Sequence, residues 1–564
     1  MSAQIFCRTF NQDVYQTLLA SGIAPLQARL YAARQVKNAD ETQDNLKTLL
    51  PFDGLKNINT LCTRLAAAIR LQERIVIVAD YDADGATACA LGVKGLRSMG
   101  GVVDFLVPNR FEHGYGLSPA LAQLAADAGA QVLLTVDNGI AALAGVERAQ
   151  QLGIDVLITD HHLPGDTLPD CVIVNPNQPD DAFASKALAG VGVMFYVLCA
   201  LRRLLREQNH FNHRLPEPVM AQWLDLVALG TVADVVTLDH NNRILVAQGL
   251  KRIRSGKMCI GIRALFHIAK RDWRKAACFD LGFAVAPRLN AAGRLDDMSL
   301  GIACLLAETE TQANALAAQL DNLNRERRQI EHGMLDEALM GLNDINIDQR
   351  YSAVVYRNDW HQGVIGIVAG RLRERFNRPA IVFAPADNDK LRGSGRSIAA
   401  LHLRDALDLV SKREPDLIIQ FGGHAAAAGL TISQANFPRF QAAFEAVCQE
   451  YLQPEDLNQH YLTDGTLNAD ELTLQHAREL GAAVWGQGFA PPCFHDNFEV
   501  RWQKAVGSGH LKAGLCKDGK IFEAMFFRCT DILPDSIRAV YRPIANEWQQ
   551  QQELQLYVDY WEVA

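Results

Sequence analysis

From residue 74 onward the chain alternates short runs of β-branched and aliphatic residues with stretches rich in alanine and leucine. The apolar runs are "RIVIVAD", "VVDFLVP", "QVLLTVD", "DVLITD" and "CVIVNP", and helical stretches follow the first three. This alternation indicates βαβ units, which build a doubly wound parallel sheet. Ligands of such sheets bind beyond the carboxyl ends of the strands, so we expect functional residues at those positions.

The 564 residues are too many for one hydrophobic core, and their patterns divide them into five segments. Residues 1–70 have apolar side chains at helical spacing, and residues 71–300 contain the βαβ pattern. Residues 301–348 include an amphipathic stretch without Gly or Pro, which predicts a long helix joining two lobes. A second, smaller α/β pattern covers residues 349–450, and residues 451–564 predict a small β-barrel. The expected fold class is therefore α/β with an added barrel.

Composition excludes several classes of protein. The net charge of −9 does not indicate a polyanion partner, so any surface that binds nucleic acid must be local. Twelve cysteines without a C-x-x-C pair argue against a zinc ribbon or a disulfide framework and fit a reducing compartment. The start lacks the pattern of a signal peptide, and the longest apolar run, at 188–201, is too short to span a membrane. We therefore expect a cytoplasmic protein.

Acidic side chains and histidines gather where the expected strands end. Eight of them are Asp80, Asp82 and Asp84 in "DYDADG", Asp137 in "VDNG", Asp160, His161 and His162 in "DHH", and Asp234 in "GTVADVV". Carboxylates crowded at one rim of a sheet repel one another unless cations lie between them, so the cluster predicts a binuclear metal site. Oxygen ligands with one or two histidines favour manganese or magnesium over zinc. Two such ions can activate a water and stabilise phosphate oxygens during an in-line displacement.

Each of these motifs also has an ordinary structural interpretation. "DYDADG" alone could be a turn that caps the following helix, and Asp137 before "NG" could be a turn residue. "DHH" alone could be a capped turn with one partly buried histidine. The metal site is favoured because these motifs occur together at the strand ends of consecutive βαβ units.

A second group of motifs suits a phosphodiester backbone. Residues 356–404 hold nine Lys or Arg against four Asp or Glu, although three of these arginines, Arg371, Arg373 and Arg375, could simply form solvated helix faces. In "RGSGRS" we expect the two glycines to expose backbone N–H groups beside Ser394 and Arg396. In "FGGHAAAAG" we expect Gly422 and Gly423 to let a strand approach closely beside His424. Either motif alone could be no more than a glycine-rich turn.

The motifs together resemble a known family. "DYDADG", "VDNG", "DHH" and "GTVADVV" match the four motifs of the DHH phosphoesterase superfamily. "VPNRFEHGYGL", "APRLNAAGRL", "WHQGVIGIVAGRL", "GSGRS" and "GGHAAAAG" are similar to those of the RecJ family, the bacterial single-strand-specific DNA exonucleases. The resemblance covers nearly the whole chain, is strongest from about residue 74 to 430, and is weakest in the last hundred residues.

The resemblance implies a DHH catalytic domain, a connecting helix, a DHH-associated substrate-binding domain that faces the metals across a cleft, and a terminal OB-like barrel. It implies that two ions, Mn²⁺ or Mg²⁺, are held by Asp80, Asp82, Asp84, Asp137, His161 and Asp234, with Asp137 as the bridging ligand. His162 would hydrogen-bond the scissile phosphate or the leaving oxygen, and Asp160 would fix the neighbouring imidazole. Some members have a histidine four residues before the second aspartate, where this chain has Val78, so one coordination position must be filled differently.

The resemblance also implies how the substrate is bound. Arg110, Ser394 and Arg396 would hold a 5′-terminal phosphate, and the strand would follow Arg288, Asn290, His361, Gly422, Gly423 and His424. His113 would lie on the same rim as the metals. A narrow cleft, stacking on Tyr115 or Trp360, and the barrel would select single strands. Within the barrel we expect Phe494 and Trp502 to be core residues.

The expected function is metal-dependent 5′→3′ degradation of single-stranded DNA to mononucleotides in DNA repair and recombination. Expected partners are single-stranded DNA with a 5′ end, a single-strand-binding protein and a RecQ-type helicase, with the chain acting as a monomer. One alternative is a DHH-family pyrophosphatase or a phosphodiesterase of oligonucleotides or cyclic dinucleotides; the long helix and the C-terminal region argue against it. Another is a non-catalytic DNA-binding scaffold, which would have no reason to keep a repulsive acidic cluster.

Overall fold

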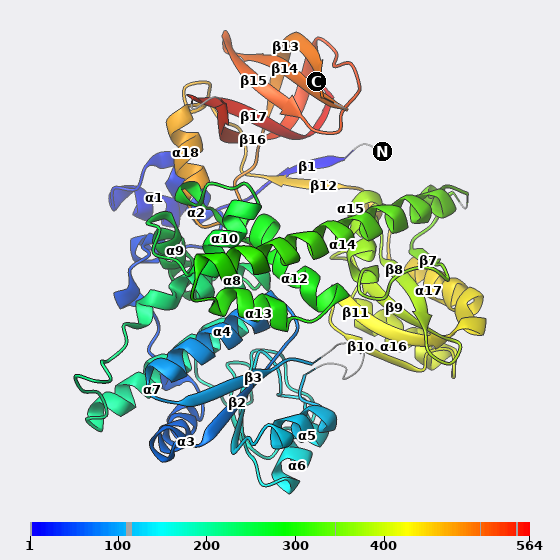
Figure 1. Cartoon of the computed structure of the whole chain (residues 1–564). Helices are drawn as coiled ribbons and strands as arrows, with labels where there is room; N and C mark the ends of the chain where they lie inside the picture. Colours follow the sequence, from blue (N-terminus) through cyan, green and yellow to red (C-terminus); the bar gives the residue numbers. More distant parts are fainter. Residues whose placement is uncertain (1–2, 109–115, 345, 508, 549–550) are drawn as a thin grey trace. The chain divides into compact units, whose positions relative to one another are not determined.

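The computed structural model describes residues 3–108, 116–344, 346–507, 509–548 and 551–564 (Figure 1). The chain divides into two compact units. The larger unit contains Cys7–Leu323 and Leu462–Ala564, and the smaller contains Met1–Phe6 and Asn324–Tyr461. Within the described ranges, no helix combines the length and the apolar content needed to cross a membrane.

A five-stranded parallel sheet forms the first layer of the larger unit. Its order is β3-β2-β4-β5-β6, and every neighbouring pair is parallel. The strands are β2 (Arg74–Ala79), β3 (Val102–Leu106), β4 (Val132–Val136), β5 (Asp155–Thr159) and β6 (Val172–Val174). The chain crosses from β2 to β3 on one side and then returns to β4 on the other. The topology therefore reverses between β2 and β4, and ligands bind at such a switch point.

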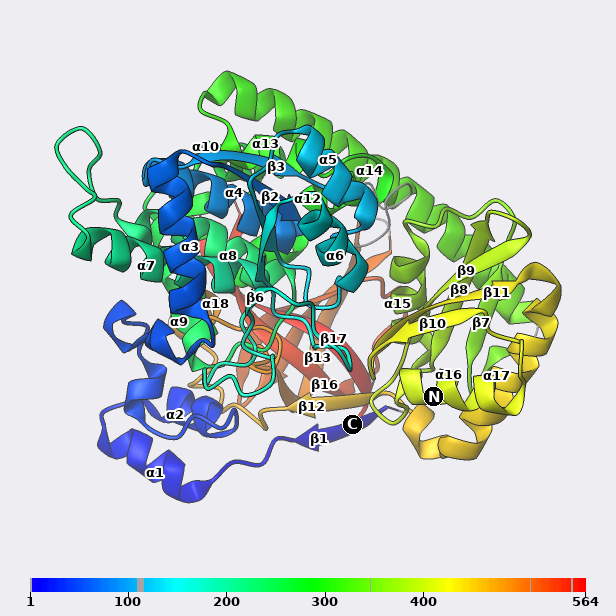
Figure 2. The same cartoon turned by 90° about the horizontal axis from the view of Figure 1, so that it is seen from below.

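Helices cover both faces of this sheet, as the two alternating sets of apolar side chains require (Figure 2). In β2, Ile75, Ile77 and Ala79 face one core, whereas Val76 and Val78 face the other. The first core includes residues of α3 (Ile58–Leu71), α4 (Ala83–Ser98), α7 (Gly190–Glu207) and α8 (Leu224–Ala233). The second includes residues of α5 (Pro119–Asp127) and α6 (Leu143–Gln151).

Further helices complete this part of the larger unit. They are α1 (Gln12–Ala20), α2 (Pro25–Ala32), α9 (His240–Arg254), α10 (Ile260–Ile268), α11 (Cys278–Asp280), α12 (Ala286–Leu295) and α13 (Ser299–Leu306). A π-helical turn, Leu281–Val285, joins α11 to α12. The N-terminal region also contains a strand, β1 (Gln4–Cys7), which pairs with β12 (His460–Thr463) and which the helical spacing did not predict. The predicted connecting helix is α14 (Glu310–Asp344), which continues past residue 332.

The smaller unit contains a mixed sheet of order β10-β11-β9-β8-β7. Its strands are β7 (Ala353–Tyr356), β8 (Ala380–Ala386), β9 (Lys390–Arg396), β10 (Gln420–Gly423) and β11 (Ala427–Ser433). Only β7 and β8 are parallel among these strands. The helices are α15 (Ile365–Phe376), α16 (Leu403–Arg413) and α17 (Phe437–Tyr451). Phe383, Phe440 and Phe444 form the centre of its core.

The C-terminal strands close into a barrel of order β13-β14-β15-β17-β16. They are β13 (Phe494–Val506), β14 (His510–Lys517), β15 (Lys520–Phe526), β16 (Ser536–Trp548) and β17 (Gln551–Val563), preceded by α18 (Leu474–Ala482). The barrel closes through parallel pairing of β15 with β17, which gives the strand arrangement of an OB fold. Phe494 is buried in the barrel core as expected, but Trp502 is 43% exposed, so its predicted core position is wrong. Trp502 lies at a β-bulge, which turns its ring out over Gly514.

Candidate metal centre

Strand ends place the acidic residues at the switch point of the parallel sheet. Asp80 follows β2 and Asp137 follows β4, and these strands are neighbours in the sheet. Asp160, His161 and His162 follow β5, the next strand. Three groups of these side chains have ligand atoms within 4.8 Å of one another: Asp80, Asp82 and Asp137; Asp137, His161 and His162; and Asp84, His161 and Asp234. Asp137 belongs to two of the groups.

Asp82 and Asp84 begin helix α4 and have different partners. Asp82 is the N-cap, and its Oδ1 accepts hydrogen bonds from the amides of Asp84 (2.9 Å) and Gly85 (3.0 Å). Asp84 is buried, and its carboxylate accepts from the amides of Gly190 (2.6 Å) and Val191 (3.0 Å) at the start of α7. The two aspartates are thus fixed by the N-termini of two different helices.

Asp137 and His161 present buried polar atoms to each other without forming a hydrogen bond. Asp137 Oδ1 and His161 Nε2 lie 3.0 Å apart, and neither atom has a hydrogen-bond partner within the described residues. Burial is the main cause that lowers the pKa of His161 to about 4, so the neutral ring makes no ion pair with Asp137. Two ligands at right angles around a cation with bonds of about 2.1 Å also lie about 3.0 Å apart. The pair therefore fits a shared metal ion.

Backbone strain marks two of the positions. Asp137 has φ +63° in the turn after β4, where its amide donates to the carbonyl of Thr159 (3.0 Å). Asp234 ends α8, its Oδ2 lies 3.6 Å from His161 Nε2, and the following Val235 has φ +62°. A β-branched residue in the left-handed region is strained and needs the surrounding structure to hold it there. The chain therefore turns sharply directly after Asp234, where the helix ends close to His161.

Three carboxylates of the cluster, those of Asp84, Asp137 and Asp234, resist ionisation without a cation between them. Burial, followed by the charge of Asp82, raises the pKa of Asp84 to about 7. Burial, followed by the charge of Asp84, also raises the pKa values of Asp137 and Asp234 well above the ordinary range. Divalent cations would offset both the burial of the carboxylate charges and the repulsion between them, because they supply opposite charge where water is excluded. The donor set of carboxylate oxygens and one neutral imidazole therefore fits Mn²⁺ or Mg²⁺.

Asp160 holds the second histidine of the motif. Its Oδ1 lies 2.8 Å from His162 Nδ1 and accepts the amides of His161 (2.7 Å) and His162 (3.1 Å). Its Oδ2 accepts the amide of Ile140 (2.9 Å). Burial lowers the pKa of His162, but the hydrogen bond and charge of Asp160 outweigh it and raise that pKa to about 9. The ring is therefore an imidazolium at neutral pH, with Nδ1 donating to Asp160.

Three helical glycines bring their helices against the cluster, and the sequence analysis did not identify them. A Cβ atom at Gly190 of α7 would lie 2.5 Å from the Asp137 side chain, and one at Gly230 of α8 would lie 2.7 Å from Asp84 Oδ1. A Cβ atom at Gly293 of α12 would lie 1.8 Å from the carbonyl oxygen of Tyr81. Glycine is unfavourable inside a helix, so its presence in "LAGVGV", "ALGTV" and "NAAGRL" was the available signal.

The expected substrate residues of the larger unit have partners within the protein. Arg288 lies on α12, where its guanidinium contacts Asp321 (2.9 Å) and donates to the carbonyl of Ala284 (2.6 Å). Asn290, two residues further on, accepts the amide of Ala83 at the start of α4 (2.7 Å), so it also fixes the loop that carries Asp82. Arg110, His113 and Tyr115 lie outside the described residues.

Ser394 and Arg396 share one face of β9 in the smaller unit. Arg396 lies 3.3 Å from Ser394 Oγ, and a Cβ atom at Gly366, in the first turn of α15, would lie 3.0 Å from that oxygen and 3.2 Å from the guanidinium. Among the described residues, no acidic side chain forms an ion pair with Arg396. Burial, followed by the charge of Arg373, lowers its pKa. A hydroxyl, an uncompensated cation and a helix N-terminus form an anion-binding arrangement.

The glycines of "RGSGRS" do not act as predicted. Gly393 and Gly395 lie inside β9, which pairs with β8 on one side and β11 on the other, so their N–H groups belong to the ladder. Their packing needs small residues, because a Cβ atom would lie 2.5 Å from the Phe383 ring at Gly393 and 2.8 Å from Leu403 at Gly395. The prediction that the N–H groups of these two glycines are exposed is therefore wrong.

The remaining predicted substrate residues of the smaller unit lie at the ends of its elements. Gly422 and Gly423 end β10; an added Cβ atom at Gly422 would have no atom within 4 Å, whereas Gly423 at φ +142° packs against the backbone of β11. His424 is exposed, and its amide donates to the carbonyl of Ala427 (2.8 Å). His361 precedes α15 and accepts the amide of Gly363 (3.1 Å). Trp360 is only 5% exposed and donates to Glu337 (2.8 Å), so it is no surface for base stacking.

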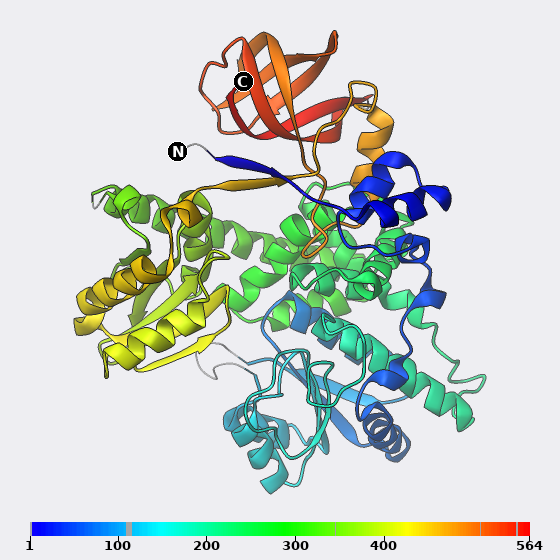
Figure 3. The same cartoon turned by 180° about the vertical axis from the view of Figure 1, so that it is seen from behind.

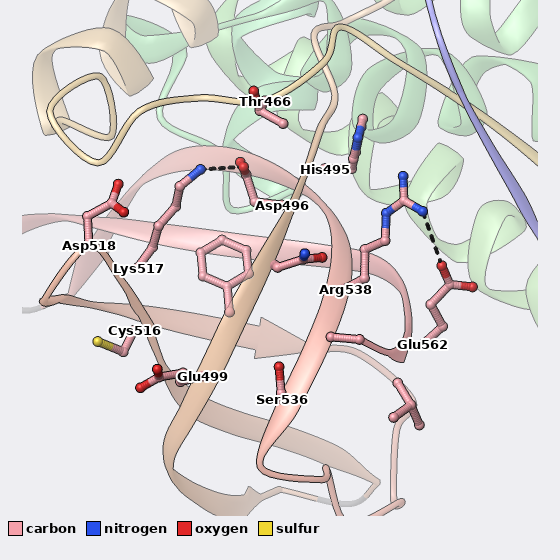
Figure 4. Close-up of a pocket in the computed structure, with 14 residues that line it drawn as sticks. Thr466, His495, Asp496, Glu499, Cys516, Lys517, Asp518, Ser536, Arg538 and Glu562 are labelled. Atoms are coloured by element: carbon pink, nitrogen blue, oxygen red, sulfur yellow. Dashed lines mark hydrogen bonds and ion pairs between the residues drawn. The ribbon is translucent and has the colours of Figure 1, made fainter.

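The barrel contains a cavity of about 780 Å³ that does not suit a nucleic-acid backbone (Figure 4). Its charged lining consists of Asp496, Glu499, Asp518, Glu562, Lys517 and Arg538. Lys517 pairs with Asp496, and Arg538 lies 3.7 Å from Glu562. Four acids against two paired cations leave an acidic lining, which phosphates would avoid.

Fold and site together define a class of metal-dependent phosphoesterase, built on a doubly wound sheet with acidic strand ends. The DHH family, N-terminal domain matches residues 74–231, the DHHA1 domain matches residues 349–450, and the RecJ OB domain matches residues 463–560.

Relatives identify the particular family. The chain is 47% identical to the single-stranded-DNA-specific exonuclease RecJ of Escherichia coli K12, over 99% of each chain, and 47% identical to that of Salmonella typhimurium LT2, over 96% of each. It is similar to the crystal structure of RecJ in complex with Mn²⁺ from Thermus thermophilus, with a TM-score of 0.82 and 29% identity, covering 100% of this chain and 79% of that one. The chain belongs to the RecJ family of single-stranded-DNA-specific exonucleases.

Proposed function

We propose that this chain is a metal-dependent exonuclease that degrades single-stranded DNA from the 5′ end to mononucleotides. The observation that carries the proposal is the buried contact between Asp137 Oδ1 and His161 Nε2, two ligand atoms 3.0 Å apart without hydrogen-bond partners in the described protein. The names of the relatives support the substrate, because they are single-stranded-DNA-specific exonucleases.

Six side chains would hold two divalent ions: Asp80, Asp82, Asp84, Asp137, His161 and Asp234. Solved RecJ structures from Thermus thermophilus are complexes with Mn²⁺ and with Mg²⁺, which supports these two metals here. When bound, the ions supply an activated water and neutralise phosphate oxygens. Asp137, which belongs to two of the ligand groups, is our candidate for the bridging ligand.

His162 would act on the leaving oxygen. Its Nδ1 proton is held by Asp160, and its raised pKa keeps a second proton on Nε2 at neutral pH. Nε2 can therefore donate a hydrogen bond, and then the proton, to the oxygen that departs from phosphorus. Asp160 orients the ring and stabilises its charge without touching the substrate.

The smaller unit would bind the 5′-terminal phosphate. Ser394, Arg396 and the start of α15 form the anion-binding arrangement, and Arg110 would add a second guanidinium. Binding of the terminal phosphate ahead of the scissile phosphodiester would give the 5′→3′ direction. The strand would pass residues from both units: Arg288, Asn290, His361, Gly422, Gly423 and His424.

We further propose the cellular setting of this activity. The chain would act as a cytoplasmic monomer in DNA repair and recombination, on strands delivered by a RecQ-type helicase and covered by a single-strand-binding protein. Sedimentation of the purified chain tests the monomer, and co-purification from lysate tests the two partners.

The experiment that tests the function uses end-labelled single-stranded DNA, duplex DNA, pyrophosphate and a cyclic dinucleotide with Mn²⁺ or Mg²⁺. We expect mononucleotides to be released from the 5′ end of single strands alone. Asp137→Ala should lower kcat by at least roughly 100-fold, because even residues that only orient ligands cost about 10- to 100-fold. Asp127→Ala, an exposed aspartate on α5, is the control. Full activity of Asp137→Ala would show that the metal mechanism is wrong.

Arg396→Ala tests the terminal-phosphate pocket separately. We expect KM for 5′-phosphorylated strands to rise while metal affinity stays unchanged, with Arg404→Ala, an exposed arginine of the same unit, as the control. The same KM rise for strands with and without a 5′ phosphate would contradict the pocket.

A further inference from the structure

Two phenylalanines of the larger unit expose their rings side by side on a short helical segment. Phe279 is 54% exposed and Phe283 is 72% exposed. Their ring centroids lie 4.8 Å apart and the planes differ by 25°, so the rings are stacked. Exposed apolar groups that adjoin on a protein surface are candidates for a binding site.

The segment that carries the rings is anchored beside the metal centre. Leu281 and Val285 are fully buried on its inner face, and a Cβ atom at Gly282 would contact Val232, two residues before Asp234, at 3.4 Å. The segment includes the π-helical turn Leu281–Val285, and such turns occur frequently at functional sites. It continues directly into α12, whose residue Asn290 fixes the loop of Asp82. The rings therefore lie on a segment that packs against α8, the helix that ends at Asp234.

A cation lies beside these rings. The Arg271 guanidinium lies 5.6 Å from the Phe279 ring centroid. The surface therefore combines two exposed rings with a neighbouring arginine.

We propose that Phe279 and Phe283 form a base-stacking platform for the single strand on the 3′ side of the scissile phosphodiester. This inference rests on the proposed function and adds the residues that bind bases downstream of the cut. Stacking on aromatic rings tolerates every base, and interleaved arginines contact the backbone or the base faces. A duplex has its bases stacked internally and cannot use such a platform, so the rings also contribute to strand selection.

The test compares Phe283→Ala, Phe283→Leu and Phe283→Tyr in the full chain with Mn²⁺. For a long 5′-phosphorylated oligothymidylate we expect KM to rise roughly ten-fold in the Ala and Leu variants, with kcat unchanged and Tyr close to wild type. For a 5′-phosphorylated dinucleotide, which ends before the platform, no variant should change KM. Phe10→Ala, at another exposed ring pair, is the control.

Strands with a single abasic site locate the platform. An abasic site at one or two positions should raise KM for the wild type and leave the Phe283→Ala value unchanged. Three outcomes would overturn the proposal: unchanged KM for long strands, an equal change for the dinucleotide, or full rescue by Leu, which indicates packing or a protein partner. If the wild type does not hydrolyse single strands, the proposed function fails instead. Equilibrium binding of the same strands in EDTA then decides whether Phe283→Ala weakens binding.

Discussion

Two aspartates of the site have both a structural position, as a helix cap or a turn residue, and a place in a possible metal-ligand group. The sequence offered these two interpretations as alternatives. Asp82 caps α4 through Oδ1 and also belongs to a possible ligand group, so the helix cap and the proposed metal ligand are one residue. Asp137 is a turn residue at φ +63°. Like His161, it also belongs to two of the three possible ligand groups. The turn and cap geometry aims each carboxylate, because a fixed backbone fixes the side chain.

Metal stabilisation should increase with pH. Burial raises the pKa of Asp84 from 3.8 to about 7, so the metal-free folded protein binds more protons than the unfolded chain between those values. Its stability therefore falls as pH rises through this window, and cations replace the proton. We expect the rise in Tm caused by Mg²⁺ to be larger at about pH 8 than at about pH 6, measured by calorimetry with and without EDTA. An equal rise at both values would contradict this linkage.

Asp160→Asn should change the pH dependence of the reaction. Loss of the Asp160 charge removes the main cause that raises the pKa of His162, so the imidazolium loses its proton at lower pH. We expect kcat to fall roughly 10- to 100-fold and the alkaline limb of the kcat profile to move to lower pH. Rates on single-stranded DNA with saturating Mg²⁺ measure both. An alkaline limb that stays in place would remove His162 from the proton-transfer step.

At the scale of elements, the site depends on how closely helices approach the strand ends. Helices α7, α8 and α12 each present a glycine to the cluster, and none of these glycines has room for a Cβ atom. Amide groups at the start of α7 then reach the carboxylate of Asp84. The barrel cavity has an acidic lining, whereas the proposed stacking platform lies on α11 and the turn that follows it.

Gly293→Ala and Gly333→Ala should have opposite effects on stability. A Cβ atom at Gly293 would meet the carbonyl oxygen of Tyr81, so we expect Gly293→Ala to cost roughly 1–3 kcal/mol and to weaken metal binding. A Cβ atom at Gly333 of α14 has no atom within 4 Å, so Gly333→Ala should stabilise by roughly 0.5–1 kcal/mol. Denaturant unfolding and metal titration measure both effects. A stabilising Gly293→Ala would refute the close approach of α12.

At the scale of the molecule, a buried ion pair ties distant parts of the larger unit together. Arg34 of the N-terminal region donates two hydrogen bonds to Asp464, at 2.8 and 2.9 Å, and Arg8 lies 3.6 Å away. Both side chains of the main pair are buried. Gln27 of α2 also contacts Glu479 of α18 at 2.6 Å. Figure 3 shows the N-terminal helices, in blue, beside α18, in gold. The N-terminal helices are thus joined to the segment that leads into the barrel.

Asp464→Ala should destabilise the larger unit. It leaves the Arg34 cation buried without its main partner, which costs about 3–5 kcal/mol. Replacing both partners, as in Arg34→Met with Asp464→Leu, should recover most of that loss because no charge of the pair then stays buried. The midpoint of urea unfolding, followed by tryptophan fluorescence, gives both values. If the double variant is less stable than Asp464→Ala, the destabilisation does not come from the unpaired charge.

The sequence alone determined the parallel sheet, the long helix, the barrel and the gathering of carboxylates at strand ends, because these follow from local periodicity and from the rule that parallel strands end at one rim. Tertiary structure alone decided that Gly393 and Gly395 lie inside a strand, that Trp360 is buried and that Trp502 is exposed. It also decided which glycines let helices reach the proposed metal ligands. The physical reason is that periodicity reports each segment's own preference, whereas close packing depends on which distant segment lies opposite.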